Sequence, residues 1–127
     1  LGYISKSIVD NSIGFNDATL ILRETETNEI PFLPLRYFFS TVQNNLIERG
    51  GHSHKECSQI LFCLAGAIKV ICLWEEEKLE VELHPGIEAL LVPPGVWCKE
   101  VFITSDSILG VLASHPYDPS DYIYESP

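Results

Sequence analysis

Short apolar runs and turn-forming residues alternate along most of the chain. Combinations of Gly, Pro, Asn, Asp or Ser that favour turns occur at Asn44-Asn45, Arg49-Gly50-Gly51, Ala65-Gly66, Pro85-Gly86, Pro93-Pro94-Gly95 and Ser105-Asp106. Nowhere does an apolar period of three to four residues persist long enough to indicate a helix. The pattern predicts strands over Ala18–Glu24, Arg36–Gln43, Gly51–His54, Ser58–Leu64, Ile68–Trp74, Leu79–Leu83, Ala89–Val92, Trp97–Phe102 and Ile108–Ala113. Such closely spaced strands are typical of an antiparallel sandwich or jelly roll, so we expect an all-β fold.

Two of these strands, Ser58–Leu64 and Ile68–Leu73, are apolar on nearly both faces. A strand in a sheet with one solvated face would alternate between apolar and polar residues, so both strands are expected to be covered on both sides. A second sheet would cover one face and a partner in a dimer the other. The acidic run Glu75–Glu77 is expected to form a solvated hairpin turn.

The composition limits the possible functions. With 127 residues, of which 46% are hydrophobic and 20% charged, residues 1–127 are expected to form one folded domain. Because the chain begins at Leu1, we expect it to be trimmed or a piece of a longer protein. A net charge of −10 argues against binding nucleic acid but permits one small anionic ligand held by a few basic residues. The longest apolar run, Ile60–Ile68, is too short to span a membrane.

The four cysteines contain no CxxC pair, and three of them lie inside apolar runs. Free cysteine in such a position behaves as a small hydrophobic residue. We therefore expect reduced thiols and a cytoplasmic protein.

The histidines His52 and His54 are the strongest candidates for chemistry. Residues two apart in a strand point to the same side, so both imidazoles enter the same space. They could be metal ligands, a proton-transfer pair or polar residues on a wet face. The flanking Arg49-Gly50-Gly51 and Lys55 favour a function, because histidine exchanges protons near neutral pH and a nearby arginine can stabilise an enediolate or hold a phosphate.

The spacing around these histidines resembles the motifs of the cupin superfamily. The first motif would be His52-x-His54, four residues, Gln59, six residues, Gly66. The second would be Gly86, six residues, Pro93-Pro94-Gly95, two residues, Cys98. A metal-binding cupin has Glu at Gln59 and His at Cys98, so the resemblance implies a jelly-roll barrel without a metal. The remaining alternative is a metal-dependent cupin in which His52, His54 and Cys98 bind zinc or copper.

A closer resemblance is carried by four segments: "NEIPFLPLRYFF", "ERGGHSHKECSQILFCLAGAIKV", "LLVPPGVWCK" and "VLASHPYDPSDYIY". They are similar to the sugar 3,4-ketoisomerases, also described as WxcM-like, over about residues 30–124. The resemblance implies a dimeric, metal-independent jelly roll without a cofactor. It also implies transfer of the keto group of a deoxythymidine-diphosphate (dTDP)-4-keto-6-deoxyhexose from C4 to C3 through an enediol(ate), in deoxysugar synthesis for a lipopolysaccharide or another surface glycan.

Carried over by position, the resemblance assigns proton transfer to His52 and His54. It assigns substrate binding to a second group, namely Arg36, Phe38, Arg49, Gln59 and Trp97.

Several positions depart from the family pattern. Phe38 stands where the family has a tyrosine, Cys98 where it has a histidine and Tyr124 where it has an arginine, and an early Asp-x-Arg-Gly segment is missing. A phenyl ring cannot relay a proton as a phenol can. Two alternatives follow: a divergent isomerase, or a nucleotide-sugar-binding protein that has lost catalysis.

The remaining polar residues are expected to be structural. The segment with Tyr117, Asp118, Asp121 and Tyr122 is expected to close the end of the barrel, with Asp121 capping a turn. His84 is expected in a turn, His115 without a sequence-local partner, and Glu24 at an exposed strand end.

Overall fold

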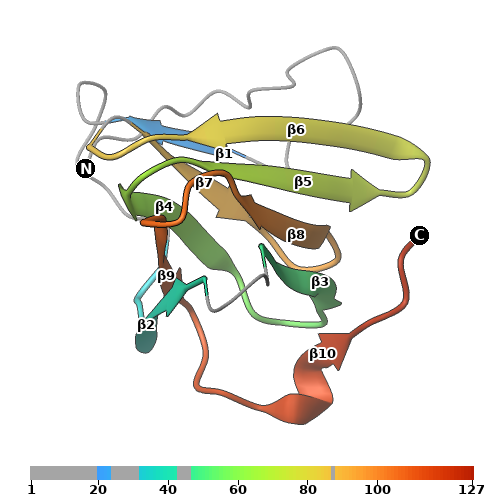
Figure 1. Ribbon diagram of the computed structural model, residues 1–127. Coiled ribbons are helices and arrows are strands. Elements are labelled where there is room, and N and C mark those ends of the chain that lie inside the picture. Colours follow the sequence, from blue (N-terminus) through green and yellow to red (C-terminus); the bar gives the residue numbers. More distant parts are fainter. Residues whose placement is uncertain (1–19, 24–31, 43–46, 87) are drawn as a thin grey trace.

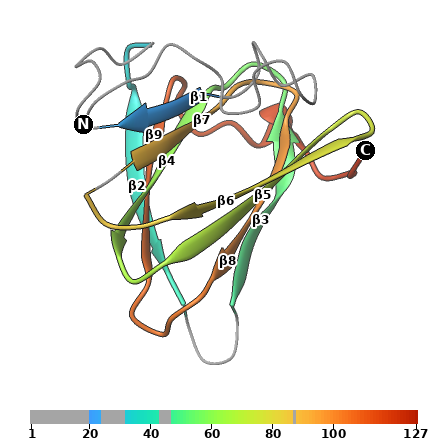
Figure 2. The ribbon, with the colours of Figure 1, turned by 90° about the horizontal axis from the view of Figure 1, so that it is seen from above.

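Two antiparallel sheets face each other and enclose the core (Figures 1 and 2). The computed structural model describes residues 20–23, 32–42, 47–86 and 88–127. The strands are β1 (Leu20–Arg23), β2 (Arg36–Thr41), β3 (Glu48–His54), β4 (Gln59–Ala65), β5 (Ile68–Trp74), β6 (Glu77–Leu83), β7 (Glu88–Val92), β8 (Trp97–Phe102), β9 (Ile108–Ala113) and β10 (Tyr122–Ile123). One sheet has the order β1-β7-β4-β9-β2 and the other β10-β3-β8-β5-β6, with every pairing antiparallel. The predicted all-β jelly roll is confirmed.

Most strands lie where the sequence predicts them, because turn residues end each apolar run. The acidic turn between β5 and β6 is exposed at Glu75 and Glu76, as predicted. The predicted strand ends at Ala18, Glu24 and Gln43, and the turn at Asn44-Asn45, lie outside the described residues. Within the described ranges no helix is long and apolar enough to cross a membrane.

The prediction of a turn at Arg49-Gly50-Gly51 was wrong. These residues belong to β3, where the register against β8 shifts between Gly50 and His52. Gly50 has φ +82°, and a Cβ there would collide with the Glu100 carboxylate and lie 2.9 Å from the carbonyl oxygen of Cys98. The glycines therefore mark a β-bulge, for which the sequence signal is the same as for a turn.

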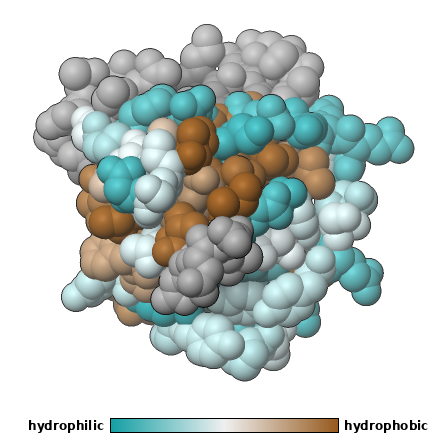
Figure 3. Space-filling model, in the orientation of Figure 1, coloured by the Kyte–Doolittle hydropathy of each residue, from teal (hydrophilic) through white to brown (hydrophobic). Residues whose placement is uncertain are grey.

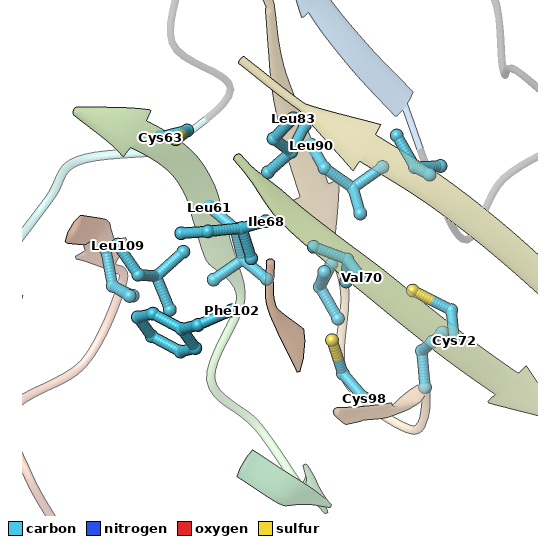
Figure 4. Packing of buried hydrophobic residues seen from close by; sticks show 14 residues of the cluster. Leu61, Cys63, Ile68, Val70, Cys72, Leu83, Leu90, Cys98, Phe102 and Leu109 are labelled. Atoms are coloured by element: carbon cyan, nitrogen blue, oxygen red, sulfur yellow. The ribbon is translucent and has the colours of Figure 1, made fainter. Parts of the chain in front are cut away.

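The core fills the space between the sheets (Figure 4). Leu61 and Leu109 from the first sheet meet Val70 and Phe102 from the second, and each is at most 3% exposed. The outer face of β4 is also covered, since Ile60 is fully buried and packs in a cluster that includes Phe32. At Ile60, the predicted covering of the outer face of β4 is thus confirmed, and residues of the same chain provide it. Covering of this face by a dimer partner stays a prediction.

The segment after β9 returns to β3 and was not predicted to form elements. A 3₁₀ helix, η1 (Pro119–Asp121), begins where Asp118 accepts a hydrogen bond from the backbone N–H of Ser120. β10 follows at once and pairs with the end of β3, with Tyr122 opposite His54 (Figure 1). This return brings the end of the chain against the predicted histidine pair.

Candidate active site

The two histidines lie side by side at the end of β3. Their ring centroids are 5.0 Å apart and the ring planes are nearly perpendicular, at 81°. His54 is 5% exposed and His52 is half-buried. The strand geometry therefore places both imidazoles on one side, as the sequence predicts.

Tyr122 of β10 packs against both histidines. Its ring centroid lies 4.6 Å from that of His52 and 4.5 Å from that of His54. Tyr124 approaches His52 at 5.9 Å and stacks on Tyr122. These contacts fix the orientation of the imidazoles and remove water from one side of them.

Asp121 binds His54 directly. Its Oδ2 lies 2.9 Å from Nδ1 of His54, and its carboxylate also accepts hydrogen bonds from the backbone N–H groups of Glu56 and Cys57. Because a carboxylate only accepts, Nδ1 of His54 donates, and Nε2 of the neutral ring carries the free lone pair. Nε2 is buried and has no hydrogen-bond partner among the described residues. His54 thus presents an unoccupied proton acceptor.

Burial keeps both imidazoles uncharged near neutral pH. It lowers the pKa of His52 to about 4, helped by the neighbouring His54 and opposed by a hydrogen bond with the backbone of Gly50. Burial also lowers the pKa of His54, although contact with Asp121 acts in the opposite direction. For Asp121, burial raises the pKa, but the hydrogen bonds it accepts outweigh this and keep it below its usual value. Two bases are thereby available in one place.

A cavity of about 190 Å³ opens beside His52, between the two sheets. Residues from β2, β3, β4, β8, β9 and β10 line it, namely Phe38, Ser40, Arg49, Gly50, His52, Gln59, Glu100, Leu109, Val111 and Tyr122. Four of the seven residues predicted for the site are in this lining. The lining thus combines a histidine, an arginine and a glutamate with mostly uncharged residues.

The other three predicted residues lie near the cavity but do not line it. His54 packs against two residues that do line it, His52 and Tyr122. The guanidinium carbon of Arg36 lies 5.1 Å from the ring centroid of Phe38 and 5.5 Å from that of Tyr117. Trp97 lies 3.7 Å from the position of a Cβ on Gly51, and its Nε1 is buried with no partner in the described part of the chain. Substrate binding by Arg36 and Trp97 stays a prediction.

Glu100 is a cavity residue that the sequence reasoning missed. It is 7% exposed, and burial raises its pKa to about 8. The available signal was a charged residue on the apolar face that Cys98 and Phe102 share with it in β8. Asp121 was also assigned wrongly: Asp118 caps the turn, and Asp121 holds His54.

The residues that could hold a metal differ from the predicted set. Ligand atoms of His54, Cys57 and Asp121 lie within 4.8 Å of one another. However, the nitrogen of His54 that faces Asp121 already donates to it, so the geometry fits a hydrogen bond. Cys98 packs in the core beside Cys72, as expected for a packing residue. Hydrogen bonding with Cys72 and burial raise the pKa of the Cys98 thiol well above its usual range, which disfavours the thiolate that a metal requires.

A second hollow, of about 220 Å³, lies against η1 and does not include the histidine pair. It is lined by Glu56, His115, Pro116, Tyr117, Asp118 and Asp121. His115 has a sequence-local partner after all, because its Nδ1 lies 2.7 Å from Oγ of Ser114. His84 lies in an exposed turn, as predicted, with Glu82 3.1 Å away.

Comparison with known proteins shows the family of this chain. A family model described as FdtA: WxcM-like, C-terminal, matches residues 7–127. The chain belongs to this family. A curated relative, the TDP-4-oxo-6-deoxy-alpha-D-glucose-3,4-oxoisomerase of Aneurinibacillus thermoaerophilus, is 36% identical over 98 residues, which are 77% of this chain and 70% of the relative. The predicted membership of the sugar 3,4-ketoisomerases and the prediction of an isomerase are confirmed.

Solved structures of 3,4-ketoisomerases have the same fold. A mutant of the 3,4-ketoisomerase QdtA from Thermoanaerobacterium thermosaccharolyticum, in complex with TDP-4-keto-6-deoxyglucose, superimposes with a TM-score of 0.76. It is 29% identical, and the alignment covers 85% of this chain and 88% of QdtA. WlaRA, the TDP-fucose-3,4-ketoisomerase of Campylobacter jejuni, is 22% identical with a TM-score of 0.75, over 84% of this chain and 89% of its own, and shows the fold alone. The cupin-type jelly roll is therefore shared with these enzymes.

Proposed function

We propose that this protein moves the keto group of a dTDP-linked 4-keto-6-deoxyhexose from C4 to C3. The relatives described above act on or bind such nucleotide sugars. The observation that carries the proposal is the pair of adjacent, uncharged imidazoles, of which His52 lines a cavity and His54 is buried and hydrogen-bonded to Asp121. An isomerisation of this kind needs a base that removes a proton and returns it one carbon away.

In the proposed mechanism, His52 and His54 are the proton-transfer pair. An imidazole removes the proton from C3, an enediol(ate) forms, and the imidazolium returns the proton to C4. The lowered pKa of His52 keeps the acceptor free at neutral pH, and Asp121 directs the lone pair of His54 to Nε2. The residues proposed to bind the substrate are Arg36, Phe38, Arg49, Gln59 and Trp97. Arg36 and Arg49 would stabilise the negative charge of the diphosphate or of the enediolate.

The test is proton NMR of the protein with dTDP-4-keto-6-deoxyglucose in deuterated water. We expect loss of the C3 proton signal and appearance of a 3-keto product. His52→Asn and His54→Asn should each slow this exchange by about 10²- to 10⁴-fold, the usual contribution of a general acid or base. His84→Asn is the matched control, because the same substitution there changes an exposed turn. Exchange that persists unchanged in both site variants would refute the mechanism.

A second candidate is a nucleotide-sugar-binding protein without catalysis. Phe38 favours it, because this cavity residue has no hydroxyl group where the family resemblance implies a tyrosine. In the same experiment, this candidate predicts shifted ligand resonances without exchange at C3. A metal-dependent cupin would instead contain stoichiometric iron, zinc or copper by elemental analysis.

A homodimer is part of the proposal. β2 is an edge strand of its sheet, and its outward residues Tyr37 and Phe39 are 71% and 56% exposed. Leu35, just before them, is 56% exposed. Hydrophobic residues also gather near the centre of the face seen in Figure 3, with hydrophilic residues around them. Exposed apolar side chains on an edge strand favour pairing with a second copy of the chain. We expect sedimentation to report twice the chain mass, and Tyr37→Glu should shift it toward the monomer.

The proposed setting is deoxysugar synthesis for a surface glycan, in the cytoplasm. A reducing compartment agrees with the four cysteines, which are all buried and free.

A further inference from the structure

Glu100 is a carboxyl group on an otherwise apolar surface. On the inner face of β8 its neighbours Cys98 and Phe102 are 7% and 3% exposed, and Glu100 is as buried as they are. Burying a polar group without a partner costs free energy that an apolar side chain would not. Glu100 lines the same cavity as His52. Its burial therefore points to a role in that cavity.

The surroundings of Glu100 favour its neutral form. Arg49 lies opposite it in the register of β3 and β8, but the Nη2 of Arg49 donates to the carbonyl oxygen of Thr41, at 2.8 Å. Oε2 of Glu100 and Nε of Arg49 are both buried, and neither has a hydrogen-bond partner among the residues that the structure describes. Since burial raises the pKa of Glu100 to about 8, the group carries a transferable proton at neutral pH.

The other titratable groups around Glu100 are few. Arg49 lies opposite Glu100 in the register, and His52 and Tyr122 line the same cavity. Cys98 lies two residues before Glu100 on the same face of β8, and the β5 residue opposite Glu100 is the uncharged Val70. The side chains that β2, β4 and β9 contribute to the cavity lining are uncharged. The backbone also leaves room for Glu100, because only a residue without a Cβ fits at Gly50.

We propose that Glu100 is a catalytic residue that carries a proton between the two oxygens of the sugar, while the histidine pair carries one between the two carbons. This inference rests on the proposed function. Phe38 lines the same cavity and has no hydroxyl group to do this. Glu100 thus takes over the proton transfer that a tyrosine at position 38 could perform and that Phe38 cannot.

The proposed isomerisation consists of two half-reactions, and atoms and electrons balance in both. In the first, an imidazole takes the proton from C3, the C3–H electron pair forms the C3–C4 double bond, and the C4 carbonyl oxygen takes the proton of Glu100. In the second, the Glu100 carboxylate takes the proton of the C3 hydroxyl group, whose electron pair forms the C3 carbonyl bond. The double-bond pair then takes the proton of the imidazolium at C4. Both groups return to their starting states without an oxidant or a reductant.

The test compares kcat and KM for dTDP-4-keto-6-deoxyglucose in four proteins: unsubstituted, Glu100→Gln, Glu100→Asp and Glu76→Gln. The amide cannot transfer the proton, so Glu100→Gln should lower kcat by about 10²-fold or more with little change in KM. Glu100→Asp, which keeps the acid, should recover part of kcat. Glu76→Gln makes the same substitution in the exposed β5–β6 turn and should leave both constants unchanged.

The outcomes separate the two proposals. If the unsubstituted protein isomerises and Glu100→Gln is equally fast, the role of Glu100 is wrong and the proposed function stands. If the unsubstituted protein neither exchanges nor isomerises this sugar, the proposed function fails and the inference fails with it. Should Glu100→Gln not fold, the pH profile of the unsubstituted protein decides: kcat should fall above a pH of about 8, and a rate that stays level to pH 10 would overturn the role.

Discussion

At the scale of single residues, the site holds a base and an acid whose pKa values shift in opposite directions. Burial lowers the pKa of His52 to about 4 and raises that of Glu100 to about 8. Both shifts have one cause, because loss of water disfavours the charged form of either group. Between these two values the imidazole is an uncharged base and the carboxyl group is a protonated acid. Proton transfer by both groups requires this combination.

The shift of Glu100 predicts how stability depends on pH. Its folded-state pKa is raised above the unfolded value of 4.5, so its contribution is fully present below pH 4.5 and is lost as pH rises through about 8. Relative to Glu100→Gln, the unsubstituted protein should therefore melt at progressively lower temperature between pH 5 and pH 8. Thermal unfolding of both proteins across this range measures the difference. A constant difference in Tm would show that the carboxyl group is not protonated in the fold.

Asp121 acts through His54, so it is a positioning residue. Asp121→Asn removes the obligate acceptor and permits the tautomer in which Nε2 carries the proton. We expect kcat to fall by roughly 10²-fold or more, since an Asp-to-Asn change at such a dyad produces the wrong tautomer. Nitrogen NMR of the imidazoles should show the change of tautomer, which a purely structural role would not produce. Asp106→Asn, in an exposed turn, is the control. An unchanged tautomer in Asp121→Asn would contradict this role.

At the scale of elements, β3 and β10 make the site together. β3 carries both histidines, and its bulge at Gly50 leaves space for the side chain of Glu100. β10 pairs only Tyr122 and Ile123 with it, yet it brings Tyr122 against the imidazoles. The bulge and the short β3–β10 pairing thus determine how the histidines, Glu100 and Tyr122 lie relative to one another.

The bulge predicts different costs for two glycines. Gly50 and Gly86 both have positive φ, +82° and +74°, but a Cβ on Gly86 would meet nothing within 4 Å. Gly86→Ala should cost about 1 kcal/mol, the strain of a left-handed residue. Gly50→Ala should cost about 3 kcal/mol or more, because the new Cβ also collides with Glu100. Urea unfolding of both variants measures the two losses in the free energy of unfolding. Equal losses would mean that the close approach of Glu100 to Gly50 does not affect stability.

At the scale of the whole molecule, local sequence patterns predicted the positions of the strands but not the contacts between residues far apart in the sequence. Alternation and turn residues are local signals, so the strand positions and the shared side of His52 and His54 could be derived from them. The pairing of His54 with Asp121 joins residues 67 positions apart, and no local pattern reports it. The resemblance to known ketoisomerases indicated the histidines and the pocket. It did not indicate Glu100, whose signal is a single charge on an apolar strand face.

The short pairing of β10 also has a consequence for heat tolerance. Only Tyr122 and Ile123 pair with β3, and Asp121 adds hydrogen bonds to His54, Glu56 and Cys57. With so few contacts, we expect this segment to detach at a lower temperature than that at which the two sheets unfold. Detachment would free the ring of His54 and admit water to it. Activity should then disappear at a lower temperature than the far-ultraviolet circular dichroism signal of the sheets, and return on cooling. The upper working temperature of the enzyme would be set by its smallest strand rather than by its core.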